Sequence, residues 1–239
     1  AAATINRPDD RRIGSVGKPL PGVRVELDRG VSGGESDSGE IIIYGHGVMA
    51  GYHQLPDDTA KTLTSDGGLR TGDLGRFDRD GFLHITGRIK ELYKLENGKY
   101  VAPAVLEEKL TLSPFIEQAL VYGDDRPFNV ALVVPNRQAL EAWARDHGMT
   151  AAPFEALLRV PEVRELVEGE IARASVDFKA FERIAAFALL TQPFSVEDGT
   201  LTPTLKVKRR KVVERYQERL DGLYPTPAAR AGPTAHASA

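Results

Sequence analysis

A change of residue pattern near residues 88–91 constrains this chain of 239 residues more than any other feature. Before it, Gly and Pro residues separate short alternating segments, which predict strands at residues 23–27, 41–44 and 82–86. After it, apolar residues recur at helical spacing, beginning behind Pro103, a residue suited to a first helical turn. The pattern therefore predicts a β-rich unit followed by a unit that mixes helices and strands.

The second unit has the periodicity of an α+β fold, in which a small sheet is flanked by helices. A final helix is expected over residues 205–220, where Val213, Tyr216 and Leu220 share one face. The other expected elements are a helix starting at Pro103, strands at 118–122, 130–134 and 185–191, and helices at 137–146, 153–158 and 161–174.

We expect a domain boundary between residues 89 and 90. Residues 1–89 would form the β-rich subdomain, and residues 90–224 the smaller α+β domain. Residues 225–239 cannot bury enough apolar surface to order themselves, so we expect a disordered tail there.

Composition excludes several classes of function. The formal net charge of −3 gives no general attraction for nucleic acid or an anionic membrane, so an anion site must come from local arrangement. Cys is absent, which excludes disulfides and thiolate chemistry and suits a reducing compartment. No apolar run reaches the ~18 residues of a spanning helix, and residues 1–12 lack the apolar core of a signal peptide. We expect a soluble, cytoplasmic protein with at most peripheral membrane contact.

Residues 65–91 predict a hairpin that carries an unusual pair of charges. The dipeptide Asp80-Gly81 is typical of a two-residue turn, and such a turn would make the numbers of facing residues sum to 161. Asp73 then faces Arg88 across the two strands.

The Asp73–Arg88 pair has a structural and a functional explanation. A cross-strand ion pair at a surface is worth only ~0.2–1 kcal/mol. However, Gly72 and Gly87 would let a ligand approach the backbone beside each charge. A carboxylate accepts from two vicinal hydroxyls and a guanidinium donates to hydroxyl or phosphate oxygens, so the two side chains together suit a ribose.

A second candidate is the segment 202–212, which has five cations among residues 206–211. Such a run is often a solvated helix face, and a nucleic-acid-binding helix is an alternative that the acidic net charge disfavours. The cations crowd the first turns of the expected helix, where positive charge is mildly unfavourable, which indicates an anionic partner. A lysine directed at a phosphate is the more specific hypothesis.

Other motifs are weaker. Asn97-Gly98 is a turn signal that could simply reverse the chain. The five His residues show no ligand spacing, and no Gly-rich phosphate loop or nucleophile motif appears. We therefore assign no metal site to protein ligands.

Several motifs resemble those of the adenylate-forming superfamily, which includes acyl-CoA synthetases, luciferases and peptide-synthetase adenylation domains. GEIIIYGHGVMAGY is similar to the GE-x4-G-x5-GY element, LRTGDLG to the YRTGD element and GRIKE to the hinge motif. LTPTLKVKRR resembles the last family motif, with Leu205 in place of the usual Gly and Lys206 aligned with the catalytic lysine; Lys208 is a second candidate. KLENGKYVAPAVLEEKL and TPTLKVKRRKV look most like the long-chain fatty acyl-CoA synthetase branch.

The resemblance implies a nucleotide site in the first unit. Asp73 would bind the ribose hydroxyls of ATP and of an acyl-adenylate. Ile85 would pack near the nucleotide, and Arg88 would contact the ribose or a phosphate. These roles agree with the pairing expected from the hairpin.

The resemblance also implies a moving second unit. Lys90 would be the hinge about which this unit rotates as a mobile lid, and Gly98 would lie near the pantetheine of CoA. Lys206 would contact the α-phosphate and carboxylate oxygens during adenylation. The implied substrates and cofactors are ATP with Mg²⁺, a fatty acid and CoA.

The resemblance covers the chain to about Tyr224, but the family's amino-terminal domain has no counterpart. We therefore expect the carboxy-terminal part of a long-chain fatty acid-CoA ligase, which is inactive without that domain as its partner. One alternative is a non-catalytic binding or regulatory module, an interpretation that Leu205 supports. Another is an adenylating enzyme for a different carboxylate, because acyl specificity lies in the missing part.

Overall fold

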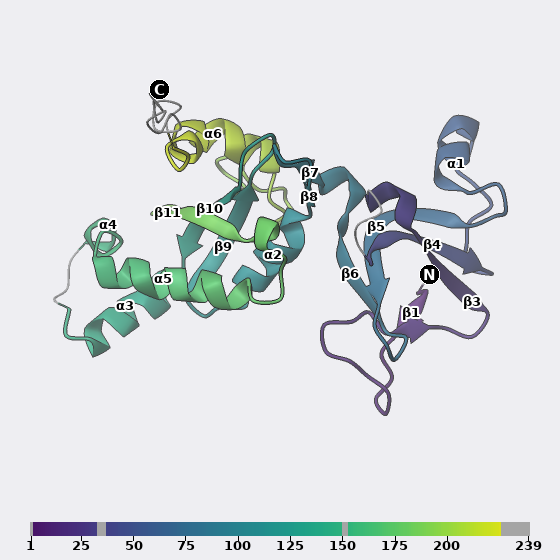
Figure 1. Ribbon diagram of the computed structural model, residues 1–239, viewed down its shortest axis with the longest axis horizontal. Helices are drawn as coiled ribbons and strands as arrows, with labels where there is room; N and C mark the ends of the chain where they lie inside the picture. Colours follow the sequence, from purple (N-terminus) through teal and green to yellow (C-terminus); the bar gives the residue numbers. More distant parts are fainter. Residues whose placement is uncertain (1, 33–36, 150–152, 226–239) are drawn as a thin grey trace, which may run out of the picture. The chain divides into compact units, whose positions relative to one another are not determined.

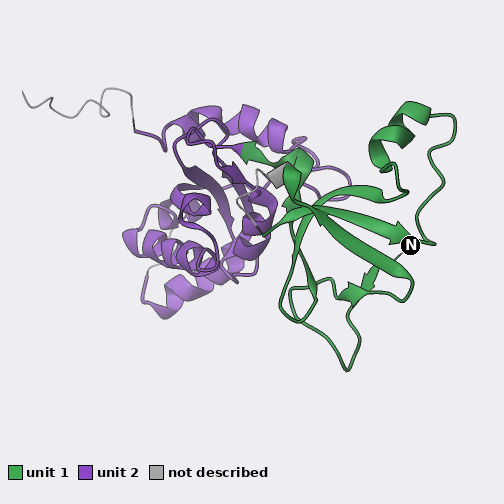
Figure 2. Ribbon diagram, turned by 45° about the vertical axis from the view of Figure 1, so that its right-hand side comes forward, with its two compact units in different colours: residues 1–93 green, residues 94–239 purple. Residues whose placement is uncertain are grey.

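The computed structural model describes residues 2–32, 37–149 and 153–225. The chain forms two compact units, Ala1–Tyr93 (unit 1) and Lys94–Ala239 (unit 2), which Figure 2 distinguishes by colour. This division falls a few residues after the boundary expected from the sequence. Apart from Pro225, the tail expected to be disordered lies outside the described residues.

Unit 1 is built on a four-stranded antiparallel sheet of order β3-β4-β5-β6 (Figure 1). The strands are Val23–Asp28 (β3), Gly39–Gly45 (β4), Leu69–Phe77 (β5) and Leu83–Arg88 (β6). The three segments whose alternation predicts strands fall on β3, β4 and β6. The smaller elements are β1 (Thr4–Ile5), which pairs with β2 (Lys18–Pro19), η1 (Arg29–Ser32), α1 (Pro56–Thr62) and η2 (Ile89–Glu91).

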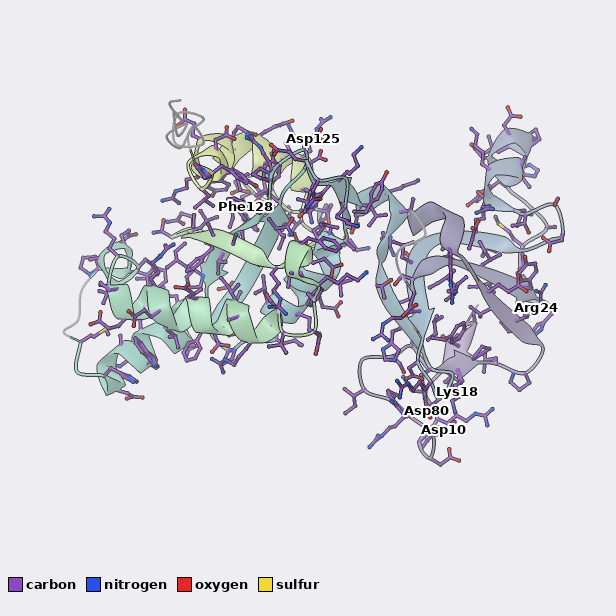
Figure 3. All side chains as sticks on the ribbon, in the orientation of Figure 1. Asp10, Lys18, Arg24, Asp80, Asp125 and Phe128 are labelled. Carbon is purple, nitrogen blue, oxygen red and sulfur yellow. The ribbon has the colours of Figure 1, made fainter. Side chains whose placement is uncertain are left out.

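The amino-terminal segment of unit 1 fixes the end of the β5–β6 hairpin. The backbone N–H of Leu83 donates to the Gly17 carbonyl at 2.9 Å. Lys18 pairs with Asp10 at 2.9 Å, two residues that Figure 3 labels. The Lys18 ammonium also lies 4.4 Å from the centre of the Phe82 ring. Phe82 and Leu83 are both buried, so this end of the hairpin is packed rather than free.

The prediction of a two-residue turn at Asp80-Gly81 is wrong. The N–H of Asp78 donates to the Phe82 carbonyl at 3.0 Å, so the loop contains three residues, 79–81. Gly81 has φ 81°, a left-handed conformation that costs glycine little. The sequence did contain the glycine that this three-residue loop requires.

A bulge in β6 compensates for this longer loop. Gly75 faces Ile85, whereas the two-residue turn predicts Thr86 as its partner. Beyond them Leu74 faces Gly87, so Thr86 is an extra residue in β6 and restores the register. Asp73 therefore faces Arg88, as predicted.

Unit 2 contains a three-stranded sheet of order β11-β10-β9. Its central strand, Asn129–Pro135 (β10), runs antiparallel to Ile116–Tyr122 (β9) and parallel to Ile184–Leu189 (β11). A parallel pair needs a long crossover, supplied here by α3 (Arg137–Asp146), α4 (Phe154–Leu157) and α5 (Pro161–Ala174). The remaining elements are β7 (Tyr93–Lys94), β8 (Tyr100–Val101), α2 (Pro103–Leu110), η3 (Ala180–Glu182) and α6 (Arg209–Asp221).

Both faces of β10 are buried. Ala131 and Val133 pack in a cluster that includes residues of α2 and α5. Leu132, on the other face, belongs to a cluster with Val212 and Leu220 of α6. A strand that helices cover on both faces is apolar at consecutive positions, which explains the run of apolar residues in β10.

The sequence predicted most elements of unit 2 but misplaced the start of the last helix. The helices expected at 137–146 and 161–174 match α3 and α5. The helix expected from residue 205 begins only at Arg209, because residues 202–206 form a tight turn in which Leu205 has φ 61°. Among the described residues, no helix is long and apolar enough to cross a membrane.

Candidate functional site

The Asp73–Arg88 pair forms an ion pair on unit 1. Arg88 Nε lies 3.1 Å from Asp73 Oδ1, and the two side chains are 60% and 30% exposed, respectively. Both groups therefore keep donor or acceptor capacity toward solvent. The pair can contact a ligand without a change in the fold.

A bulge in β5 places Asp73. Glu40 faces Leu74 and Ile42 faces Arg70, so residues 71–73 of β5 lie opposite Ile41 alone. The hydroxyl of Thr71 donates to the Ile41 carbonyl at 2.8 Å and accepts from the N–H of Asp73 at 3.1 Å. These two bonds hold the bulge in shape.

Gly72 lies at the middle of this bulge. Its φ of 72° is left-handed, and no atom lies within 4 Å of the position that a Cβ would occupy. Glycine is therefore required here by backbone conformation rather than by lack of space. The open space beside Gly72 leaves the backbone next to Asp73 accessible.

A buried carboxylate supports the bulge. Glu40 is only 5% exposed, and its Oε1 accepts from the N–H of Gly72 at 3.2 Å. Its Oε2 accepts from Arg70 Nη1 at 2.6 Å, and Arg70 also contacts Asp28 at 3.2 Å. Hydrogen bonds to Glu40 first, and then to Asp28, raise the pKa of the Arg70 guanidinium above its usual value. A buried charge that is paired in this way is stable, whereas the same carboxylate alone would not be.

A pocket of about 630 Å³ opens beside the bulge within unit 1. Gly72 and Thr71 line it, but Asp73 and Arg88 do not. The other lining residues are Glu40, Tyr52, Leu55, Asp58, Lys61, Thr62, Arg70, Ile89 and Lys90. The candidate pair thus lies at the margin of a mixed polar and apolar pocket.

The other residues singled out by the resemblance in unit 1 lie on β6 and just after it. Ile85, 40% exposed, is free to pack against a ligand. Lys90 is an exposed residue in η2, a single 3₁₀ turn that directly follows β6. Short segments of this kind can absorb the backbone rotation of a hinge.

Four loops in the described residues share one hydrogen-bond pattern, and one of them ends at Lys206. In each, the backbone N–H of the first residue donates to the carbonyl of the fifth, and the carbonyl of the first accepts from the N–H of the fourth. The fourth residue is Gly67, Gly81 or Gly98 in three loops, with φ between 81° and 87°. In the loop 202–206 it is Leu205, with φ 61°, a conformation that costs a non-glycine residue ~1–2 kcal/mol. The backbone conformation at position 205 therefore favours glycine.

The same loop holds Lys206 by its backbone. The N–H of Thr202 donates to the Lys206 carbonyl at 2.8 Å, and the N–H of Lys206 donates to the Thr202 hydroxyl at 3.0 Å. The side chain is exposed, so it is free to reach a ligand. Gly98 occupies the fourth position of the loop between β7 and β8 and is also exposed.

Three of the five clustered cations have partners inside the chain. Arg209 donates to both carboxylate oxygens of Glu107, at 2.7 and 2.8 Å, and to the Val121 carbonyl at 2.6 Å. Arg210 and Lys211 both pair with Glu214. The sequence predicts an anionic partner for the cations at the start of this helix. For these three residues that partner is a glutamate of the same chain.

Lys206 and Lys208 differ from those three. Within the part of the chain that the structure describes, neither ammonium group has an ion-pair partner, and both side chains are exposed. Lys208 is the N-cap residue of α6, and its N–H donates to the Thr200 carbonyl at 2.8 Å. Of the five cations at residues 206–211, these two lysines are therefore available to an external anion.

Sequence reasoning missed the supporting pair Glu40 and Arg70. Both lie in the stretches that resemble family motifs, GE and RTGD, which was the available signal. Their contact depends on the β4–β5 register, and the bulge at residues 71–73 cannot be seen in the alternation of the sequence.

Comparison with solved structures finds adenylation domains. The adenylation domain of a carboxylate reductase from Mycobacterium chelonae gives a TM-score of 0.65 at 30% identity, covering 88% of this chain and 32% of that one. The corresponding domain from Segniliparus rugosus, solved with AMP and a co-purified carboxylic acid, gives 0.64 at 27% identity, covering 90% and 33%.

Sequence comparison identifies the family. Long-chain-fatty-acid--CoA ligase FadD15 of Mycobacterium tuberculosis is 38% identical over 221 residues, which cover 92% of this chain and 35% of that protein. The chain thus spans about a third of the length of this curated relative. Residues 91–227, more than half of the chain, match the family model of the AMP-binding enzyme C-terminal domain. The chain therefore belongs to the AMP-binding enzyme C-terminal domain family.

Proposed function

We propose that the chain is the carboxy-terminal part of a long-chain fatty acid-CoA ligase. The observation that carries this proposal is the pair of the half-buried Asp73 and the exposed Arg88, in which Asp73 lies on a bulge that a buried carboxylate supports. The name of the 38% identical relative supports the choice of a fatty acid as substrate. The amino-terminal domain, needed for activity, would be the principal partner.

The proposed reaction has two steps. A fatty carboxylate oxygen attacks the α-phosphorus of ATP, the bond to pyrophosphate breaks, and an acyl-adenylate forms. The sulfur of the CoA thiolate then attacks the acyl carbon, and AMP leaves with the oxygen. Different groups are needed in the two steps, which is the reason for a rotating lid.

In unit 1, Asp73 would accept hydrogen bonds from the two ribose hydroxyls, and Arg88 would donate to the ribose or a phosphate. The 3.1 Å ion pair holds the carboxylate in one orientation before a ligand arrives. Ile85 would pack against the nucleotide, a role that its 40% exposure permits.

In unit 2, Lys206 would neutralise the charge that develops on the α-phosphate and carboxylate oxygens during the first step. Lys90 would be the hinge of the domain rotation, and Gly98 would lie near the pantetheine of CoA during the second step. Lys208 is the alternative lysine, since its side chain is also exposed.

Mg²⁺ would accompany the triphosphate of ATP and neutralise part of its charge. The described residues contain no group of three or more His, Asp or Glu side chains that could hold a metal ion. We therefore assign no residue of this chain to the ion.

The direct test is fatty-acid-dependent exchange of pyrophosphate into ATP. It is measured on this chain alone and on the chain joined to the amino-terminal domain of a long-chain fatty acid-CoA ligase. Exchange only in the joined protein is the expected result. Absence of exchange in a joined protein that folds and binds ATP would contradict the proposal.

Three variants of the joined protein test the assignments. Lys206→Ala should lower adenylation by about 10²–10³-fold, because one well-placed donor is worth ~2.7–4 kcal/mol, and should spare thioester formation from supplied acyl-adenylate. Lys208→Ala is the matched control, and loss of adenylation in that variant alone would exchange the two roles. Asp73→Ala should weaken ATP binding, whereas an unchanged affinity would leave the pair a structural ion pair.

A further inference from the structure

Leu205 carries an apolar side chain where the backbone favours glycine. Its φ is 61°, and its side chain is 71% exposed. The equivalent positions in the three other loops of this hydrogen-bond pattern are Gly67, Gly81 and Gly98. Leu205 belongs to none of the apolar core clusters found among the described residues, so no core packing offsets its backbone strain.

The loop couples Leu205 rigidly to Lys206. The N–H of Leu205 donates to the Thr202 carbonyl at 2.8 Å, and Lys206 is held to the same threonine by two further bonds. Consecutive Cα atoms are ~3.8 Å apart. Both residues are exposed, so a ligand long enough to span them can contact the Lys206 ammonium and the Leu205 side chain together.

We infer that Leu205 strengthens binding of an acyl-adenylate by packing against the first carbons of its alkyl chain when Lys206 contacts its oxygens. This inference rests on the proposed function. An acyl-adenylate joins an anionic phosphate to a hydrocarbon chain, and an apolar side chain next to a cation matches both parts. A glycine would serve the lysine equally well but would offer the chain no apolar surface.

The test measures binding of a non-hydrolysable acyl-adenylate analogue and of AMP to the protein joined to its amino-terminal domain. Leu205→Gly removes the side chain, and Leu205→Asn keeps a side chain that tolerates the left-handed conformation. Both should bind the analogue about tenfold more weakly and AMP equally well, the discrimination that one apolar contact supports. Leu112→Ala, which truncates another exposed leucine of unit 2 (77% exposed), should change neither affinity.

Two outcomes would overturn the inference. Equal weakening of the analogue and AMP would mean that Leu205 contacts the nucleotide or another protein surface. Unchanged binding of both would mean that its side chain contacts neither ligand. Failure of the unsubstituted joined protein to exchange pyrophosphate is a separate result, which would count against the proposed function instead.

Discussion

Unit 1 and unit 2 hold their candidate residues in different ways. Asp73 stands on a bulge whose shape depends on a buried, charged side chain, Glu40. Lys206 is the last residue of a turn that its own backbone closes, on a unit whose central strand is covered by apolar side chains. A polar substitution can therefore displace Asp73 without touching the apolar core, whereas Lys206 should move only if its own loop changes.

The largest effect is expected in the core of unit 2. Leu132→Ala should lower the unfolding free energy of this unit by ~2–5 kcal/mol, because the site is fully buried between strands and α6. Fluorescence of Trp143, the single tryptophan of the chain, reports this unit. Hydrogen exchange in β3–β6 should not change, and faster exchange there would show that the units do not unfold independently.

The next largest effect is expected in unit 1. Glu40→Gln should lower its stability by ~1–3 kcal/mol, because it removes a charged acceptor from a buried hydrogen-bonded group. It should also weaken AMP binding in the joined protein, because the N–H of Gly72, next to Asp73, loses its charged acceptor. Asp28→Asn is the matched control, because Asp28 is the more exposed partner of Arg70. If both variants bind AMP normally, Glu40 does not position Asp73.

A smaller effect is expected from acid. Partial burial raises the pKa of Asp78, but other interactions outweigh this effect and lower the pKa to about 2. They are hydrogen bonds from His84 and from the N–H groups of Phe82 and Asp80, and the positive charge of Arg12. The folded value lies below the ordinary 3.8, so this carboxylate stabilises unit 1 above pH ~4, and the stabilisation is lost as the pH falls through about 2. Protection factors of the amides in β5 and β6, which correct for the intrinsic pH dependence of exchange, should therefore fall over that range.

Two variants assign the acid effect to the separate units. Asp78→Asn should reduce the acid-dependent loss in unit 1; Asp66, whose pKa a hydrogen bond from Thr64 lowers, would account for part of what is left. A hydrogen bond from Thr200 is the main cause that lowers the pKa of Asp198, so Asp198→Asn should act in the same way on Trp143 fluorescence of unit 2. If either variant changed the acid response of the other unit, the division of the effect would be wrong.

The smallest effect compares two loops with the same hydrogen bonds. Leu205→Gly should raise the stability of unit 2 by ~0.5–1 kcal/mol, because relief of left-handed strain exceeds the added entropy of an unfolded glycine. Gly81→Ala should lower the stability of unit 1, since the same conformation then carries a Cβ. Thermal unfolding of both variants checks the pair, and destabilisation by Leu205→Gly would show that the leucine packs within its own unit.

The sequence predicted unit 2 better than the details of unit 1. Helices α3 and α5 and strand β10 follow from periodicity, which depends only on neighbouring residues. The bulge at residues 71–73 depends on Glu40, a residue some thirty positions earlier in the chain, so alternation could not reveal it. The start of α6 was misplaced because Leu205 has high helix propensity but occupies a turn.

The correct pairing of Asp73 with Arg88 came from two errors that cancelled. The loop at residues 79–81 is one residue longer than a two-residue turn, and Thr86 is one residue extra in β6. The motif resemblance, rather than the register argument alone, therefore supports the selection of this pair.

The position of β10 has a consequence for how the chain folds during synthesis. Strands β9 and β10 leave the ribosome close together and can pair at once. The other edge of β10 has no partner until β11 has been made, after the whole segment from α3 to α5. A nascent chain thus carries an apolar strand with an open edge, the kind of segment that aggregates or recruits chaperones. Unit 2 should therefore complete its sheet late, and a chain truncated before Ile184 should be prone to aggregation.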